Sequence, residues 1–398
     1  YSTITASLNL PAVTNRAVGV AGGHAAAFTF DVARSIVYTR QGNPAWSGQE
    51  RDGEQPPIIR SDDLFFPDWV NFANIEIPQA DEAQRLLANM IHDMLAAKKP
   101  LPHFWYLPNG KKVVILAASD DHANGSTPTS FDQLKAASAP GCSVANWECL
   151  RATSWMYTST SVSNAQAAAY LTDGFELGVH VSTGCADWTP SSLETAFTND
   201  LQAFQAKYTI LPPQRTNRTH CIPWSDWSTH PSVELSHGIR LDMNYYYWPS
   251  SWVQNRPGFF TGSGFPMRYA DITGATIDVY QATTHLVNEN GVTYPAGINA
   301  MLDKALGPEG YYGVLGTHYD FSDSFFNQLL TTAQARSVPL VTALQVLDWT
   351  DGRNASSFGN IIWNAASSTL SFSIVQDARA RGLTTLIPAV FGNTLSTL

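Results

Sequence analysis

The sequence predicts an α/β fold built on a parallel sheet or a (β/α) barrel. Four consecutive aliphatic residues at 113–116 are typical of a strand buried on both faces. From that strand onward, helical and strand patterns alternate along the chain. Polar side chains collect directly after the strands, which is where the active sites of (β/α) barrels lie. We therefore expect one functional site at one edge of the sheet.

The individual elements follow from periodicity and capping. A helix at 163–174 ends on Gly174, a helix at 191–208 opens with the capping pattern S-S-L-E, and a third helix covers 322–337. The expected strands after residue 116 are 175–182, 219–224, 238–246, 276–283, 310–320 and 339–347.

The first hundred residues have a different composition, and we expect residues 1–105 to form an accessory region and residues 106–398 the barrel. Within the accessory region a short helix is expected at 25–38, a polar and Pro-rich loop at 42–69, and an amphipathic helix at 80–99. Leu86, Met90, Met94 and Leu95 form the apolar stripe of that last helix. The accessory region also weakly resembles the tail of an amidotransferase-like domain. The sequence begins at Tyr1 rather than Met, which indicates a processed or trimmed N-terminus.

The composition favours a carbohydrate ligand. Only 14% of the 398 residues are charged, against roughly 25% in an average soluble protein, and the chain has 12 Trp and 15 Tyr. Aromatic rings stack on sugar faces while small polar side chains pair with hydroxyls, although most of these rings are expected in the core. The net charge of −10 argues against nucleic acid. No apolar run approaches the ~20 residues that a membrane span needs.

The cysteines and sequons indicate a secreted protein. Cys142 and Cys149 bracket a short loop that could close on itself, and Cys185 and Cys221 would then pair by elimination, although four cysteines permit three connectivities. Glycosylation sequons lie at Asn124, Asn217 and Asn354. Together these features favour an oxidising, extracellular location.

The residues after the strands suggest a metal site. Asp120 and Asp121 follow the strand at 113–116. Because two neighbouring carboxylates repel each other, one of such a pair usually binds a metal while the other acts as a base. His180 ends one strand, and His318 ends another with Asp320 two residues on, so Asp320 is expected to orient the imidazole. Asp plus two His is the smallest protein set that binds a divalent ion with open positions. The alternative for the acidic pair alone is a solvent-exposed turn.

The segment around residues 242–268 is rich in aromatics and glycine, and we interpret it as a sugar-binding loop, with a packed hydrophobic corner as the alternative. The side chains expected to contact substrate there are Asp242, Asn244, Tyr246, Trp248 and Arg268.

Four motifs, taken in order, resemble the polysaccharide deacetylase superfamily of metal-dependent carbohydrate esterases. They are VVILAASDDH, GFELGVHVSTG, NRTHCIPW, and GVLGTHYDFSD followed by a helix and ARSVPLVTALQVL, and they run from about residue 111 to 352. The resemblance implies an irregular (β/α)7-type barrel, a divalent metal, Zn²⁺ by preference, and a polysaccharide or oligosaccharide substrate.

The resemblance also implies roles for individual residues. Asp120 would be the base, Asp121 and His180 metal ligands, and His318 the acid, while Arg218 would position the base and Trp224 would line the acyl pocket. Gly184 occupies the position of the family's second histidine. The missing ligand is expected to be His220 first and His122 second.

The predicted function is a secreted, metal-dependent hydrolase that removes N-acetyl groups from an amino-sugar polysaccharide. Two alternatives remain open at this point: a glycoside hydrolase that uses paired carboxylates in the same cleft, and a carbohydrate-binding barrel without activity, to which Gly184 lends support.

Overall fold

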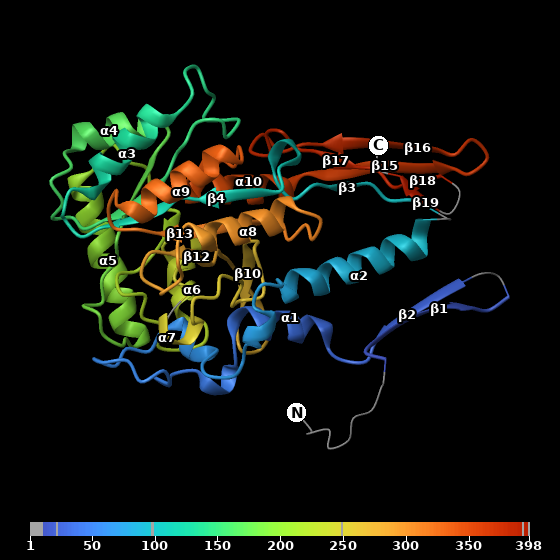
Figure 1. Ribbon diagram of the computed structural model, residues 1–398, viewed down its shortest axis with the longest axis horizontal. Helices are drawn as coiled ribbons and strands as arrows, with labels where there is room; N and C mark the ends of the chain where they lie inside the picture. The colour runs from blue at the N-terminus through green and yellow to red at the C-terminus, as the bar shows by residue number, and fades with distance from the viewer. Residues whose placement is uncertain (1–10, 21–22, 97–98, 248–249, 392–393, 397–398) are drawn as a thin grey trace.

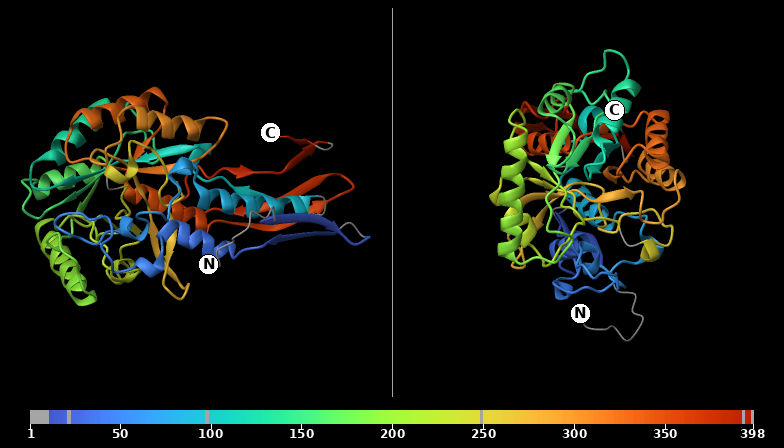
Figure 2. Two further views of the ribbon diagram at one scale, coloured as in Figure 1. Left: turned by 60° about the horizontal axis from the view of Figure 1, so that its bottom comes forward. Right: turned by 90° about the vertical axis from the view of Figure 1, so that its left-hand side faces the viewer.

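The computed structural model describes residues 11–20, 23–96, 99–247, 250–391 and 394–396. The middle of the chain folds into a rounded α/β body, and elements from both ends of the chain project from one side of it (Figures 1 and 2). The three helices expected in the body are confirmed as α4 (Asn164–Thr172), α5 (Pro190–Lys207) and α9 (Ser324–Ala335), with bounds close to the expected ones. Further helices that the sequence patterns did not predict are α3 (Ser126–Ala137), α6 (Thr229–Ser236), α8 (Ala296–Leu306) and α10 (Ala343–Ala355).

The strands of the body form three sheets whose neighbouring strands are mostly parallel. The first has the order β12-β13-β4-β14, the second β5-β6-β7, and the third β10-β11-β9-β8, in which β10 is antiparallel to β11. Their bounds are β4 (Val113–Leu116), β5 (Ala118–Asp121), β6 (Thr153–Met156), β7 (Glu176–Val179), β8 (Thr216–Asn217), β9 (Leu241–Asp242), β10 (Met267–Ala270), β11 (Thr276–Gln281), β12 (Thr284–Val287), β13 (Gly313–His318) and β14 (Leu340–Val341).

The expected barrel is not present as one closed sheet among the described residues. Isolated backbone bonds link neighbouring sheets instead: His220 N donates to Val181 O at 2.7 Å, and Tyr247 N donates to Thr284 O at 3.1 Å. β8 and β9 are short because polar side chains replace ladder bonds there. The Asn244 side chain, for example, accepts from Thr219 N at 2.8 Å. The fold is therefore mixed α/β with a fragmented sheet.

The strand at 113–116 is buried on both faces, as its aliphatic run predicts. Val113 and Ile115 belong to one hydrophobic cluster, in which α3 and α9 also take part, while Val114 and Leu116 belong to another with α10. The next strand, β5, continues directly from it and carries Asp120 and Asp121 at its end. This core therefore fixes the position of the acidic pair.

Three sequence expectations are corrected. Residues 219–224 are not a strand, because Cys221 and Ile222 have φ of 60° and 48°, which a strand cannot accommodate. The strand at 339–347 stops at Val341, and Thr342 caps α10 instead. The helix at 25–38 starts only at Val32, where α1 (Val32–Gln41) is capped by Asp31.

Residues before that cap form an antiparallel hairpin of β1 (Val13–Val18) and β2 (Gly23–Phe28). This hairpin and α2 (Gln79–Ala96) extend away from the body. From the other end of the chain, β15 (Ser357–Asn364) and β16 (Thr369–Val375) form a second projecting hairpin, and β3 (His103–Phe104) pairs with β17 (Thr385–Leu386) beside it. Further along, β18 (Ala389–Phe391) pairs with β19 (Thr394–Ser396).

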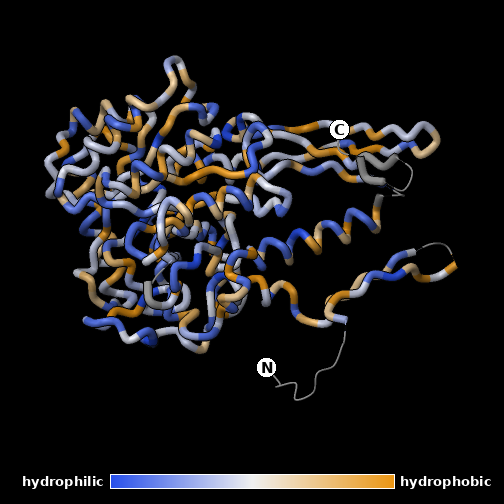
Figure 3. Tube along the Cα trace, in the orientation of Figure 1, coloured by the Kyte–Doolittle hydropathy of each residue, from blue (hydrophilic) through white to orange (hydrophobic). Residues whose placement is uncertain are grey.

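The apolar stripe of α2 is only partly covered. Met90 is buried, but Leu86 is 43% exposed, contrary to the expectation from the sequence, and Ile91 is 46% exposed. Figure 3 shows hydrophobic stretches along the projecting elements, and Ile362 on β15 is 63% exposed. Among the helices described, none is both long and apolar enough for a bilayer crossing.

The end of α1 and the first turn of α2 are attached to the body by buried polar side chains. Arg40 donates to Phe265 O at 3.0 Å, Gln41 donates to Ala270 O at 2.9 Å, and Asp81 accepts from Gly264 N at 2.8 Å. These bonds hold the N-terminal region against the sheets that carry the site.

The cysteine pairing is confirmed: the disulfides are Cys142–Cys149 and Cys185–Cys221. Of the three sequons, Asn217 is buried and its amide donates to Glu234 Oε1 at 2.7 Å, so it cannot carry a glycan in the folded protein. Asn124 and Asn354 are exposed.

We expect Gly316→Ala to lower the free energy of unfolding by about 1–3 kcal/mol, because a Cβ at this position would lie 2.5 Å from Thr283 O and force β12 away from β13. Denaturant unfolding measures the change. Gly359→Ala is the control, since its Cβ would meet only the rotatable hydroxyl of Ser373. Equal stability of Gly316→Ala and the unmodified protein would contradict the described packing.

Candidate active site

The ends of β5, β7 and β13 meet at a cavity of about 240 Å³. Asp120 lies near the end of β5, His180 directly follows β7 and His318 ends β13, as expected for polar residues at the carboxyl ends of parallel strands. The cavity is lined by Arg60, Asp120, His122, His180, Thr219, His220, Cys221, Ile222, Tyr246, Glu289, His318 and Asp320.

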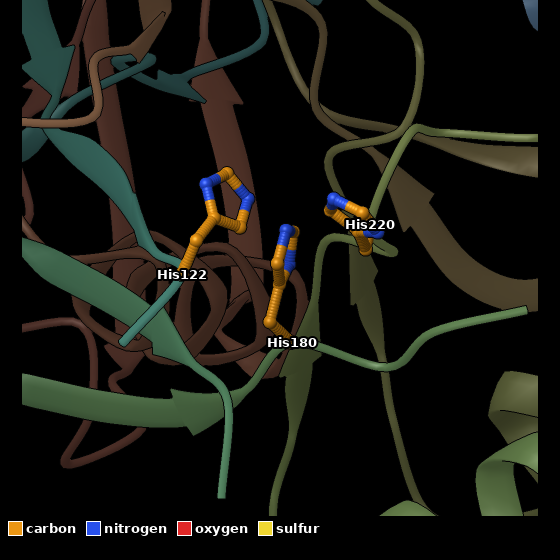
Figure 4. Close-up of side chains that lie close together, drawn as sticks. All are labelled: His122, His180 and His220. Atoms are coloured by element: carbon orange, nitrogen blue, oxygen red, sulfur yellow. The ribbon is translucent and has the colours of Figure 1, made fainter. Parts of the chain in front are cut away.

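Three histidines from separate segments converge in this cavity (Figure 4). His122 follows β5, His180 follows β7, and His220 lies in the loop after β8. Their ring centroids are 4.9–5.3 Å apart, and one nitrogen from each ring lies within 4.8 Å of the others. This is the spacing of a group that can share one metal ion.

The outer nitrogens of two of these rings face oxygen atoms. His180 Nδ1 donates to Arg218 O at 2.9 Å, and His122 Nδ1 lies 3.9 Å from Asp320 Oδ1. The Nε2 atoms of His122 and His180 are buried and have no hydrogen-bond partner among the described residues. Metal-bound histidines typically hold their outer N–H against an oxygen, as His180 does here. The donor set and its unpartnered nitrogens therefore fit a divalent metal.

Burial keeps two of the imidazoles neutral. It lowers the pKa of His180 to about 4, with His220 and His122 adding to the effect and Asp120 opposing it. Burial, together with His122, also lowers the pKa of His220. A neutral imidazole presents a lone pair, which is the form that binds a metal.

The predicted ligand Asp121 does not join this group. Its Oδ1 accepts from Asn124 N at 3.1 Å, and its Oδ2 accepts from Thr127 N at 3.1 Å and Thr127 Oγ1 at 2.6 Å. Both oxygens are thus used to anchor the loop that leads into α3. His122, the next residue, faces the cavity instead, because successive side chains at the strand end point to opposite sides.

Asp120 is held by a fully buried arginine. Arg218 Nη1 donates to Asp120 Oδ1 at 3.1 Å, and its Nη2 donates to Thr317 O at 2.6 Å. Burial alone would raise the pKa of Asp120, but Arg218, His180 and His318 outweigh it and lower that pKa far below its usual range. Asp120 is therefore an ionised carboxylate beside the three imidazoles.

His318 approaches the same carboxylate. Its Nε2 is 3.2 Å from Asp120 Oδ2 and 3.5 Å from Asp320 Oδ1, while its Nδ1 donates to Asn288 Oδ1 at 2.8 Å. The amide of Asn288, and not Asp320, thus sets the orientation of the ring. Burial raises the pKa of Asp320 above its usual value, although the nearby His318 ring opposes this effect.

The predicted substrate residues are only partly brought to the cavity. Tyr246 lines it, with its ring 5.0 Å from that of His318. Trp224, Asp242 and Asn244 are buried in the protein, and Arg268 pairs with Asp278 at 2.5 Å, so none of these four lines the cavity. Trp248 lies outside the described residues.

Some residues of the cavity were missed by the sequence argument. Arg60 comes from the N-terminal region, and its Nε donates to Cys221 O at 2.8 Å. Glu289 and Asn288 follow β12. The pattern of polar residues after strands could have found Asn288 and Glu289, because β12 ends at Val287, directly before them. No local signal in the sequence points to Arg60.

Comparisons with known proteins return structural matches only. No family model matches the chain, and no curated protein matches it. Similar solved structures include the Xyl-CE4 domain of a multidomain xylanase from the hindgut metagenome of Trinervitermes trinervoides, with 11% identity over 65% of this chain and 100% of that chain and a TM-score of 0.33.

Two further similar structures come from Bacillus. The peptidoglycan deacetylase PdaC of Bacillus subtilis shows 11% identity over 61% of this chain and 94% of that chain, with a TM-score of 0.32. A family 4 carbohydrate esterase from Bacillus anthracis shows 11% identity over 62% and 96%, also with a TM-score of 0.32. The chain is thus similar to these structures only at a large distance.

We expect His180 to remain neutral, and so able to bind an ion, at about pH 5 and to become charged near pH 4. With a pKa of about 4, His180 is about nine-tenths neutral at pH 5, whereas an ordinary imidazole with a pKa near 6.5 would be almost fully charged. The NMR shift of the His180 ring across this pH range measures the change of charge, and metal content after dialysis measures the bound ion.

His180→Ala should remove one equivalent of metal. His237→Ala, whose ring lies outside the cavity beside Glu194, should remove none. Charging of the His180 ring itself between pH 6 and 7, followed by its NMR shift, would contradict the assignment of His180 as a buried neutral ligand.

Proposed function

We propose that this protein is a divergent polysaccharide deacetylase: a secreted, metal-dependent hydrolase that removes N-acetyl groups from an amino-sugar polymer. The observation that carries the proposal is the convergence of the Asp120 carboxylate and the His318 imidazole on a cavity that also holds three metal-ligand histidines. The three fragmented parallel sheets would correspond to the irregular barrel of that superfamily. Both disulfides support the oxidising location.

His122, His180 and His220 would hold the metal, in place of the Asp-His-His set that the resemblance implies. A divalent ion bound there lowers the pKa of a water molecule and polarises an acetyl carbonyl. Three imidazoles carry no charge, so such a site would leave the full charge of the ion available for these effects, as in other three-histidine centres.

Asp120 would act as the general base. Its Oδ2 faces the cavity while its Oδ1 is occupied by Arg218. The Arg218 guanidinium keeps this carboxylate ionised and fixes its plane, so that one oxygen remains to accept a proton from the attacking water.

His318 would act as the general acid. The hydrogen bond from its Nδ1 to Asn288 directs Nε2 toward the cavity. In its charged form this ring gives the Nε2 proton to the departing amine, and the nearby Asp120 and Asp320 carboxylates stabilise that charge. Base and acid would thus act from the same side of the cavity, with His318 Nε2 3.2 Å from Asp120 Oδ2.

The walls of the cavity suit a polar sugar. Tyr246 offers a ring face, while Glu289 and Arg60 offer a carboxylate and a guanidinium for hydroxyl groups.

A glycoside hydrolase is the second candidate, and one observation favours it. Oxygens of Asp120 and Asp320 lie within 4.8 Å of each other, near the ~5–5.5 Å carboxyl separation of retaining glycosidases. That reaction gives no role to the three converging imidazoles, so we prefer the deacetylase.

The deciding experiment measures acetate release and new reducing ends from N-acetylated amino-sugar oligomers, with and without a chelator. We expect acetate release, no new reducing ends, and loss of activity with the chelator. Asp120→Asn should lower kcat by about 10²–10⁴-fold, because the base is lost while the shape is kept.

Asp132→Asn in α3 is the matched control, since its side chain contacts Tyr170 outside the cavity. Chelator-insensitive release of reducing ends would instead establish the glycosidase. Absence of both products, with retained glycan binding, would establish a binding protein.

Asn288→Ala should lower kcat by about tenfold or more with little change in KM, because the ring of His318 loses its orienting acceptor. Asn288→Asp should restore much of this loss, since a carboxylate oxygen can accept the same hydrogen bond. Steady-state kinetics of both variants test the positioning role. Equal losses in the two variants would show that Asn288 acts only through the local fold.

A further inference from the structure

A second group of ionisable side chains lies outside the catalytic cavity. His230 and Glu234 are one turn apart on α6, and Asp242 ends β9 beside them. All three are 0% exposed, and one nitrogen or oxygen atom from each lies within 4.8 Å of the others. The group is therefore sealed from solvent and compact enough to surround a single ion.

The hydrogen bonds around the group leave two atoms without partners. His230 Nε2 is bonded to Thr219 Oγ1 at 3.1 Å, and Glu234 Oε1 accepts from Asn217 Nδ2 at 2.7 Å. Within the described part of the chain, His230 Nδ1 and Glu234 Oε2 have no hydrogen-bond partner. His230 Nδ1 lies 3.6 Å from Glu234 Oε1 and 4.0 Å from Asp242 Oδ2, which is too far for hydrogen bonds.

Asp242 is held in place from the other side. Its Oδ1 accepts from Tyr269 Oη at 2.6 Å and from Asn244 N at 3.2 Å, and its Oδ2 accepts from the side chain of Asn244. Thr219, Asn217, Tyr269 and Asn244 thus surround the three side chains as polar neighbours that fix their orientation.

The charges of the group are not balanced by a basic side chain. Among the described residues, neither Glu234 nor Asp242 forms an ion pair with Lys or Arg; the nearest basic group of each is the His230 ring. Burial raises the pKa of Glu234 to about 8 and that of Asp242 well above its usual range. Two buried carboxylates need either protons or a cation between them.

We infer that His230, Glu234 and Asp242 form a structural site for a divalent transition metal, of which Zn²⁺ is the representative. An imidazole with two carboxylates is a donor set typical of Zn²⁺ and Mn²⁺ rather than of Ca²⁺. Ligands about 2.0–2.2 Å from a tetrahedral ion lie about 3.3–3.6 Å apart, close to the 3.6 and 4.0 Å separations of these donors.

The site would link elements that carry the catalytic cavity. It joins α6 to β9 and, through Thr219, to the residue next to His220. Because the group has no exposure to solvent, the ion would enter during folding and act on stability rather than on substrate. This inference does not depend on the proposed deacetylase activity.

The test uses a parent variant in which the catalytic metal site is removed, His122→Ala/His180→Ala/His220→Ala. This variant is refolded with its disulfides intact, with and without Zn²⁺, and its metal content is measured after gel filtration. We expect one equivalent of Zn²⁺, and a Tm higher by about 3 °C with the metal, as for a ligand at about 100 times its Kd.

Adding Glu234→Gln to this parent should abolish the bound Zn²⁺ and the shift in Tm. Glu176→Gln is the matched control, because the Glu176 carboxylate accepts from Thr153 and Thr216 and belongs to no such group among the described residues. If the triple-alanine parent refolds but retains no Zn²⁺, the inference is overturned. This result comes from the parent alone, so it does not depend on the folding of the Glu234→Gln variant. In that case the two carboxyl groups share protons, and Glu234→Gln, which mimics the protonated acid, would leave the stability unchanged.

Discussion

The buried guanidinium of Arg218 is the interaction on which the catalytic cavity depends. Its side chain holds Asp120 at 3.1 Å, contacts the backbone of β13 at Thr317 O, and lies over the ring of Trp155 on β6. Its own carbonyl orients the His180 ring. One residue thus fixes Asp120, the proposed base, through its side chain and His180, a proposed metal ligand, through its backbone. Removing a fully buried charge with so many partners would leave Asp120 as an uncompensated buried anion.

Much of the fold follows from local sequence signals. The aliphatic run at 113–116 predicted a strand buried on both faces, and Val113 and Val114 do face different hydrophobic clusters. Caps at Ser163 and Asp323 began helices near the expected points. The fragmentation of the sheet could not be predicted in this way, because it results from contacts between distant polar residues such as Asn244 and Thr219. The domain boundary near residue 105 stays a prediction.

The candidate site was predictable where each residue ends a strand. This rule predicted that Asp120, His180, His318, Asp320 and His220 would lie together, and all five line the cavity. Arg218 was expected there only from the family resemblance, and it bonds to Asp120. It could not decide which way the side chains of 121 and 122 point, since the turn after β5 allows either. Thr127, six residues away on α3, donates two hydrogen bonds to Asp121 and holds its side chain away from the cavity. His122 lines the cavity instead. The roles of Asp242 and Asn244 were misassigned because burial is a tertiary property that alternation along one strand does not reveal.

The disulfide beside His220 has a consequence for the order in which the protein matures. Sulfur atoms of Cys185 and Cys221 lie within 4.8 Å of a His220 nitrogen. Before the disulfide forms, the two reduced thiols and that ring would therefore make a zinc-binding group of their own. Once the thiols are oxidised to the disulfide, this competing group no longer exists, and His220 can bind an ion only together with His122 and His180. Formation of the Cys185–Cys221 disulfide would therefore keep His220 available to the proposed three-imidazole site, because the reduced thiols would compete for the same ion.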